Sequence, residues 1–179
     1  DLFQGLREKA ASLQKQPAVV PLTSPVLVCY YRRDLLEKAG LTPPATWSDY
    51  QKLLDTLGNW APGLSAVEPW GEDFRATMFL SRAVAWAKHR ENFSVFLDIA
   101  TGEPLIDSPG FVRALEAAQT AVARMPPEVK TYSPADCRRE LFAGKAALAV
   151  TFETGPVEMN TGATSVKRPE GMRVGIARL

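Results

Sequence analysis

The sequence predicts an α/β fold in which helices pack on a small mixed sheet, and three observations support this prediction. Short apolar runs rich in β-branched and aromatic residues alternate with segments whose apolar residues recur at helical spacing. Proline and glycine separate most of these segments. Hydrophobic residues make up 46% of the 179 residues, which is enough for the core of one globular domain.

The chain opens with a predicted helix and two predicted strands. We expect the helix over residues 2–13 and the strands over residues 18–22 and 26–31. The helix prediction rests on apolar residues at helical spacing, which are Phe3, Leu6, Ala10 and Leu13. Pro17 ends this helix, and the breaker Thr23-Ser24-Pro25 separates the two strands.

Residues 34–57 are predicted to form two short helices. Asp34 is a candidate N-cap for the first helix, and Gly40 supplies its C-terminal stop. Thr46 or Ser48 can cap the second helix. Its apolar residues recur at helical spacing and are Tyr50, Leu53, Leu54 and Leu57.

The middle of the chain continues the alternation. A cluster of turn-forming residues at 58–63 precedes a short buried strand at 64–67. A helix is then expected from Asp73 to about Lys88. Residues 95–106 resemble a small hairpin around the turn Thr-Gly-Glu.

The C-terminal part contains three predicted helices and two predicted strands. Ser108-Pro109 is a strong helix start, and that helix runs to about Met125. The remaining elements are expected as helices over residues 135–142 and 155–160 and as strands over residues 146–152 and 172–179. The strand at 146–152 is almost continuously apolar, which is typical of a strand buried on both faces.

The composition argues against several classes of function. The formal net charge is +1 and no basic cluster exceeds two adjacent residues, so no nucleic-acid partner is expected. No apolar stretch is long enough for direct membrane insertion. The single histidine, His89, and the widely spaced Cys29 and Cys137 fit no metal-ligand pattern, so no metal or cofactor is expected. We favour two free thiols over a disulfide.

One segment carries a resemblance to a known family. The order Tyr-x-x-Asp-Leu-Leu-x-x-Ala-Gly-Leu-x-x-Pro-x-Thr-Trp-x-x-Tyr lies within Tyr30–Tyr50. It is similar to a segment of the extracellular solute-binding proteins of ABC importers, in the sugar-binding family related to maltose-binding protein. Arg32 stands where that family usually has asparagine. Three further segments resemble the same family in the same order, which are Leu97–Pro109, Phe142–Val150 and Thr154–Pro156.

The resemblance implies one lobe of a periplasmic-binding-protein-like fold. Family members have two lobes, and residues 17–179 resemble the C-terminal lobe only, with residues 1–16 as a leftover helix of the preceding lobe. The implied partners are a small-molecule solute, most simply a sugar, the ABC permease subunits and the missing N-terminal lobe. The implied location is periplasmic or extracellular. The resemblance also allows a lipid anchor in the full-length protein.

Glu68-Pro69-Trp70 is the first candidate binding site. Sugar sites pair carboxylates with flat aromatic rings, and this segment follows a predicted strand end, where α/β sheets place ligands. It resembles a Glu-Pro-aromatic segment that contacts sugar in the family. The alternative is that Trp70 anchors the core and Glu68 is a solvated helix cap.

The second candidate site is the turn that follows the strand at 146–152. The candidate residues here are Phe152, Glu153 and Gly155, because free N–H groups at a helix start can meet ligand oxygens. Val157 replaces a tryptophan that stacks on sugar in maltose-binding relatives. Ser24 can donate a hydrogen bond into the cleft, or it can have only a turn-forming role.

The leading functional hypothesis is therefore the solute-binding component of an ABC transport system, with no catalytic residues. One alternative is a carbohydrate-active hydrolase that uses two of Glu68, Asp73 and Glu153 as acid and base or nucleophile. Another is a protein-interaction or sensor module derived from a binding-protein lobe.

Overall fold

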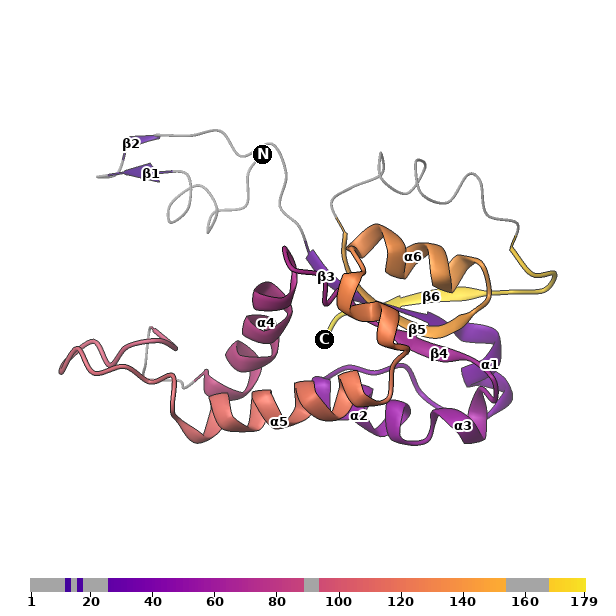
Figure 1. Ribbon diagram of the computed structural model, residues 1–179, viewed down its shortest axis with the longest axis horizontal. Helices are drawn as coiled ribbons and strands as arrows, with labels where there is room; N and C mark the ends of the chain where they lie inside the picture. The colour runs from indigo at the N-terminus through magenta and orange to yellow at the C-terminus, as the bar shows by residue number, and fades with distance from the viewer. Residues whose placement is uncertain (1–11, 14–15, 18–25, 89–93, 154–167) are drawn as a thin grey trace.

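A computed structural model describes residues 12–13, 16–17, 26–88, 94–153 and 168–179 (Figure 1). Its centre is a four-stranded mixed sheet in the order β4-β5-β3-β6. The strands are β3 (Val26–Arg32), β4 (Ser65–Val67), β5 (Ala146–Glu153) and β6 (Val174–Ala177). β3 pairs antiparallel with β5 and β6, while β4 runs parallel to β5. The predicted α/β fold with a small mixed sheet is confirmed.

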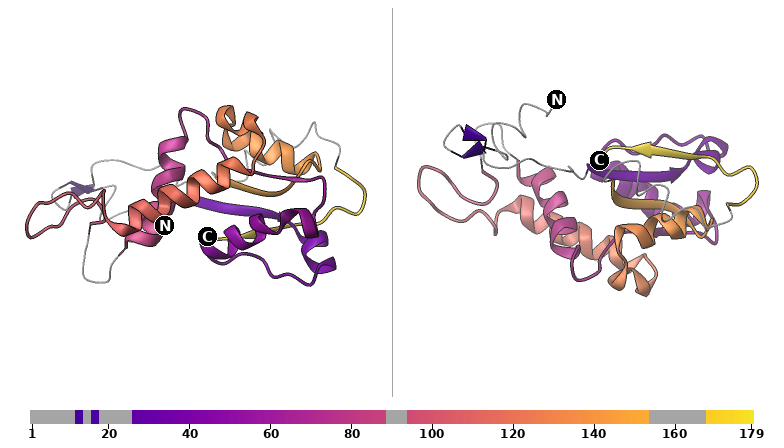
Figure 2. Two further views of the ribbon diagram at one scale, coloured as in Figure 1. Left: turned by 60° about the horizontal axis from the view of Figure 1, so that its bottom comes forward. Right: turned by 90° about the horizontal axis from the view of Figure 1, so that it is seen from above.

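Helices cover both faces of this sheet. The helices are α1 (Arg33–Lys38), α2 (Trp47–Asp55), α3 (Leu57–Trp60), α4 (Arg75–Ala87), α5 (Pro109–Ala123), the 3-10 helix η2 (Pro127–Thr131) and α6 (Pro134–Phe142). α6 lies on one face of the sheet and α2 with α3 on the other, as the left view in Figure 2 shows. α4 and α5 pack against each other at one end of the molecule (Figure 1).

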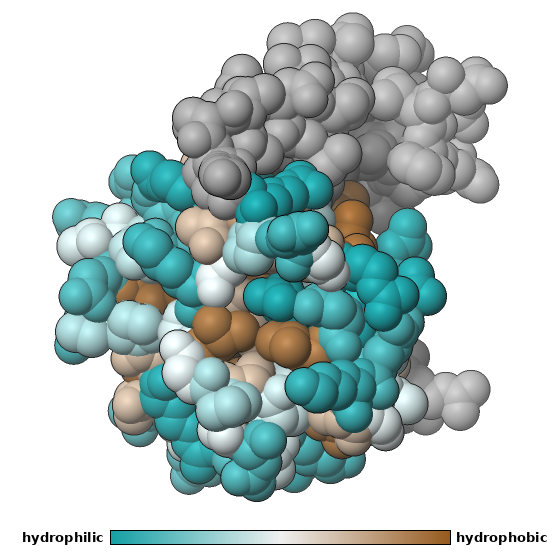
Figure 3. Space-filling model, turned by 90° about the vertical axis from the view of Figure 1, so that its right-hand side faces the viewer, coloured by the Kyte–Doolittle hydropathy of each residue, from teal (hydrophilic) through white to brown (hydrophobic). Residues whose placement is uncertain are grey.

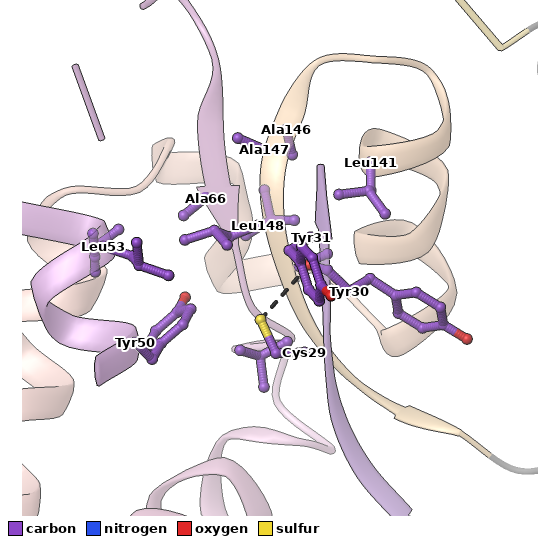
Figure 4. Packing of buried hydrophobic residues seen from close by; sticks show 14 of the residues in the cluster. Cys29, Tyr30, Tyr31, Tyr50, Leu53, Ala66, Leu141, Ala146, Ala147 and Leu148 are labelled. Carbon is purple, nitrogen blue, oxygen red and sulfur yellow. Dashed lines mark hydrogen bonds between the residues drawn. The ribbon is translucent and has the colours of Figure 1, made fainter. Parts of the chain in front are cut away.

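The main core lies between α2, the sheet and α6. In Figure 4, Tyr50 and Leu53 of α2 approach the sheet from one side and Leu141 of α6 approaches from the other. Side chains of β3 alternate between the two faces, so Cys29 lies toward α2 while Tyr30 meets the ring of Phe142 in α6. The centroids of the Tyr30 and Phe142 rings are 6.0 Å apart in an edge-to-face arrangement.

Two of the predicted helix starts have the expected caps. The Thr46 hydroxyl accepts a hydrogen bond from the backbone N–H of Asp49, 3.1 Å away, at the start of α2. Ser133 and Asp136 form a reciprocal capping box at the start of α6. Asp34 is not the cap of α1; its carboxylate pairs with Arg32 and accepts from the backbone N–H of Arg173. This prediction was wrong because the helix already begins at Arg33, and the Asp34 carboxylate binds Arg32 and the backbone just before β6.

Other differences from the expected elements are local. Residues 57–60 form the helical turn α3 instead of an open turn, because Leu57 and Trp60 bury their side chains three residues apart. Ser12–Leu13 is a strand, β1, paired with β2 (Gln16–Pro17), which contradicts the expected helix at residues 12 and 13. The expected hairpin at 95–106 is present in a short form: Leu97 and Pro104 form an antiparallel bridge, and the N–H groups of Leu105 and Asp98 donate to the carbonyl oxygens of Phe96 and Glu103.

Several expected elements lie outside the described residues. These are residues 2–11 of the first expected helix, the strand at 18–22 and the helix at 155–160. The 3-10 helix η2 had no counterpart among the expected elements.

The described surface is mainly hydrophilic at the end seen in Figure 3, where apolar side chains show only in small areas. Among the described helices, none has the length and apolarity needed to cross a bilayer.

Cys29 and Cys137 are both buried and free, as the sequence indicates. Burial raises the pKa of each thiol above its usual value, and the negative charge of Glu68 raises both further. Both cysteines therefore behave as small apolar core residues.

We expect Gly110→Ala to destabilise the fold by about 1–3 kcal/mol, because a Cβ there would lie 2.7 Å from the Cα of Ala87 and push α5 away from α4. Urea unfolding measures this change. Gly58→Ala in α3 is the matched control, since its Cβ would meet no atom within 4 Å and should leave stability unchanged or slightly raised. Equal effects of the two substitutions would contradict the close packing of α4 on α5.

We also expect both thiols to resist a disulfide reagent at pH 8 in native buffer and to react in guanidinium chloride. The physical reason is that burial excludes the reagent and disfavours the reactive thiolate. Spectrophotometric thiol counting with time measures this. Rapid modification of either cysteine in native buffer would show that β3 or α6 is not closed as described.

Candidate functional site

The sheet topology brings the predicted site segments to one end of the sheet. β4 and β5 are parallel, so their carboxyl ends lie at the same edge, where α/β sheets place ligands. β3 is antiparallel to β5 and begins at this edge, since Val26 pairs with Glu153. Glu68 and Trp70 follow β4, and Phe152 lies near the end of β5. Ser24 and Gly155 lie outside the described residues.

Backbone hydrogen bonds hold the turn after β4 in place. The N–H of Trp70 donates to the carbonyl oxygens of Glu68, at 3.0 Å, and Val129, at 3.1 Å. The N–H of Gly71 donates to the Tyr132 carbonyl oxygen at 3.0 Å. A Cβ at Gly71 would lie 2.8 Å from that oxygen, so only glycine permits this approach. The turn is therefore fixed against η2.

The Glu68 carboxylate lies inside the protein. Its side chain is 0% exposed and forms an ion pair with Arg82 of α4, whose side chain is 2% exposed. Arg82 Nη2 donates to both carboxylate oxygens, at 2.6 Å and 2.7 Å. The indole Nε1–H of Trp70 donates to Oε2 at 3.0 Å. This differs both from a carboxylate lining the cleft and from a solvated cap, because every contact of Glu68 is internal.

Aromatic rings enclose the Arg82 guanidinium. It lies 4.0 Å from the centroid of the Trp47 ring and 5.4 Å from that of the Trp70 ring. Both arrangements are cation–π contacts, which gain strength when they are shielded from water. Arg82 Nη1 is buried and has no hydrogen-bond partner among the described residues.

The phenol of Tyr50 also lies close to Glu68. Burial, as the larger cause, and the negative charge of Glu68 raise the pKa of Tyr50 well above its usual value, so its phenol stays neutral.

A groove of about 840 Å³ lies beside Trp70, between α4, α5 and η2. We name it the α4–α5 groove. Its apolar lining includes the Trp70 and Phe79 rings together with Leu115, Val122 and Met125. Arg75, Gln119 and Lys130 supply its hydrogen-bond donors. An apolar cavity of this size with a few polar groups has the general character of a small-molecule site.

The end of β5 is held by a second buried arginine. Arg138 of α6 is 6% exposed, and its Nη1 donates to the Thr151 hydroxyl at 3.2 Å and to the Phe152 carbonyl oxygen at 2.9 Å. Phe152 is half-buried and packs against the main core. Glu153 is the last residue of β5, and its side chain lies outside the described part of the chain.

The described residues give no support to a hydrolase that pairs Glu68 with Asp73, and the side chain of Glu153 lies outside them. Glu68 is buried with both carboxylate oxygens bound to donors, whereas Asp73 is exposed in the turn before α4. A glycosidase needs two carboxyl groups facing the same space. The described residues also contain no group of three or more side chains that could hold a metal ion.

Sequence reasoning missed Arg82. One signal could have revealed it, because Arg82 follows buried Met78 by four residues and thus lies on the apolar face of α4. A charge in that position needs a buried partner. The choice of Glu68 as that partner required the tertiary structure.

Comparisons with known proteins agree with the fold. A family model described as bacterial extracellular solute-binding protein matches residues 1–173. A search of curated protein sequences found no match.

Solved structures with similar folds include maltose-bound MalE3 of T. maritima, with a TM-score of 0.76 and 24% identity. Others are a solute-binding protein of Agrobacterium vitis S4 with bound D-mannitol (0.65, 18%) and a sugar transporter of Arthrobacter chlorophenolicus A6 with bound laminaribiose (0.64, 18%). These alignments cover 99%, 96% and 95% of this chain, but 44%, 40% and 44% of those proteins. The chain thus spans less than half the length of these relatives.

We expect Arg82→Met to lower the free energy of unfolding by about 3–5 kcal/mol, because it leaves the buried Glu68 carboxylate without its cation. Chemical denaturation measures the loss. Arg75→Met is the matched control on the same helix, since Arg75 pairs with Glu72 only at the surface, at 4.0 Å, and should change stability by less than about 1 kcal/mol. Similar losses for the two variants would contradict a buried charge pair.

Proposed function

Because this chain belongs to the bacterial extracellular solute-binding proteins, we propose that it forms one lobe of the solute-binding component of an ABC importer and that the solute is a carbohydrate. The family is one of binding proteins, not of enzymes. Members with two lobes close on a solute by hinge motion, so the activity proposed here is binding and delivery, without covalent chemistry.

The observation that carries the proposal is the fixed position of Trp70. Its indole follows β4 at the edge where α/β sheets generally place ligands, is tethered by its N–H to Glu68 and lines the α4–α5 groove. Sugar rings present weakly apolar faces that stack on such an aromatic surface, while their hydroxyls accept from donors like those of Arg75, Gln119 and Lys130. The maltose, laminaribiose and sugar alcohol D-mannitol bound in the three solved structures named above support a carbohydrate-like solute.

We propose Trp70 as the main contact, with Phe152, Glu153, Gly155 and Ser24 as further contributors at the same edge. The strand register supports this grouping, since the end of β5 pairs with the start of β3. Glu68 takes a different role from the one expected from sequence: it supports the ring of Trp70 from inside the protein.

The architecture of the whole protein is also part of the proposal. Residues 17–179 would form the C-terminal lobe and residues 1–16 would belong to the preceding lobe, which supplies the other half of the cleft. Coverage of 40–44% of the length of three solved relatives supports a single lobe. A permease of the ABC type would be the membrane partner, and the location would be periplasmic or extracellular, with or without a lipid anchor.

Saturation-transfer NMR of this chain with maltose, laminaribiose and D-mannitol tests the proposal, because it detects weak binding to half a site. We expect transfer to at least one of these solutes and its loss in Trp70→Ala, since aromatic stacking contributes roughly tenfold in affinity. Trp86→Ala is the matched control, because Trp86 is also partly buried but does not line the α4–α5 groove.

Two outcomes would contradict the proposal. Absence of transfer to all three solutes would argue against a carbohydrate. Micromolar affinity of this chain alone, measured by calorimetry, would argue against the need for a second lobe.

A further inference from the structure

The indole of Trp70 is held at its polar edge by a charged group. Backbone bonds to η2 fix the main chain of the turn, but they leave the side-chain torsions of Trp70 free. The ring itself is held by the hydrogen bond that its Nε1–H donates to Glu68 Oε2, at 3.0 Å. This bond is charge-assisted, so it is directional and stronger than a bond between neutral groups.

Glu68 can hold the ring only while its own carboxylate is held. It is fully buried, and a buried carboxylate without a cation is unstable in that place. Arg82 Nη2 lies within 2.7 Å of both carboxylate oxygens and supplies the missing charge. The Arg82 guanidinium is held in turn by stacking on Trp47, whose ring centroid is 4.0 Å away.

A contribution to stability alone does not account for the buried ion pair of Glu68 and Arg82. Arg82 Nη1 is buried without a hydrogen-bond partner among the described residues, which is costly. A buried ion pair is often no more stabilising than apolar side chains of the same volume. Apolar side chains could fill the space between α4 and the turn, but they could not bind the indole N–H and fix the ring.

We therefore propose that Arg82 is a positioning residue for solute binding: through the Glu68 carboxylate it fixes the orientation of the Trp70 ring at the α4–α5 groove. The chain of contacts runs from Trp47 through Arg82 and Glu68 to Trp70. The consequence for solute binding rests on the proposed function, whereas the fixing of the ring is a property of the protein without solute.

Indole N–H signals in ¹⁵N NMR of the solute-free chain test this inference. Loss of one signal in Trp70→Phe assigns the Trp70 indole. In Arg82→Met we expect its N–H signal in the folded chain to lose the downfield shift of a charge-assisted bond, a property that a lower free energy of unfolding does not by itself change.

Trp60 provides an internal control in the same sample. Its buried Nε1–H donates to the Leu53 carbonyl oxygen at 3.0 Å and makes no contact with Arg82. A changed N–H shift at Trp70 with an unchanged shift at Trp60 supports a positioning role. Equal shift changes at both rings reflect a general rearrangement and overturn the inference, as does an unchanged shift at Trp70.

Arg82→Lys serves as the second variant where Arg82→Met does not fold. Lysine keeps the positive charge but lacks the planar guanidinium that stacks on Trp47, so partial rescue is expected, with the Trp70 N–H signal losing only part of its downfield shift. No change at Trp70 in this variant overturns the inference.

Saturation transfer from the protein to maltose, measured on the same samples, separates this inference from the proposed function. Weaker transfer in Arg82→Lys together with a changed Trp70 indole N–H shift supports both. A second outcome is a changed Trp70 indole N–H shift in the Arg82 variant together with no transfer to maltose in the parent chain. This outcome supports the positioning of the ring and overturns the proposed use of that ring in binding. Maltose contact that persists while Trp70 is unaffected by the Arg82 variants overturns the inference and leaves the proposed function intact.

Discussion

The buried carboxylate of Glu68 is the constraint on which this end of the molecule depends. A charge without access to water needs a cation and hydrogen-bond donors, and here they come from α4 and from the turn after β4. Satisfying Glu68 therefore ties the sheet, the turn and α4 together. Its field also reaches Tyr50 and Cys29, where it adds to burial in raising their pKa values.

The sheet topology places the Glu68 turn next to the other segments of the candidate site. Because β4 and β5 are parallel and β3 is antiparallel to β5, two strand ends and one strand start meet at a single edge. The α4–α5 groove lies beside the same edge, with the Trp70 ring common to both. A family whose members bind solutes between two lobes would need such an edge on each lobe, with the rings fixed before the lobes close.

Local sequence signals predicted most elements because each is specified by nearby residues. Thr46 and Ser133 mark helix starts by bonding N–H groups three residues away, and β5 is recognisable from its apolar run. The failures occurred where a distant group intervened. Asp34 bonds to the backbone of Arg173 instead of capping its helix, and burial of Trp60 turned an expected loop into α3.

The sequence by itself determined the fold class and the family, since periodicity predicts the helices and strands and the ordered motifs carry the resemblance. It placed Trp70 correctly at the end of β4. Only the tertiary structure decided the role of Glu68, because a carboxylate beside a tryptophan is compatible with a cleft, a cap or the core. The choice depended on Arg82, fourteen residues away, whose buried guanidinium turns the carboxylate inward.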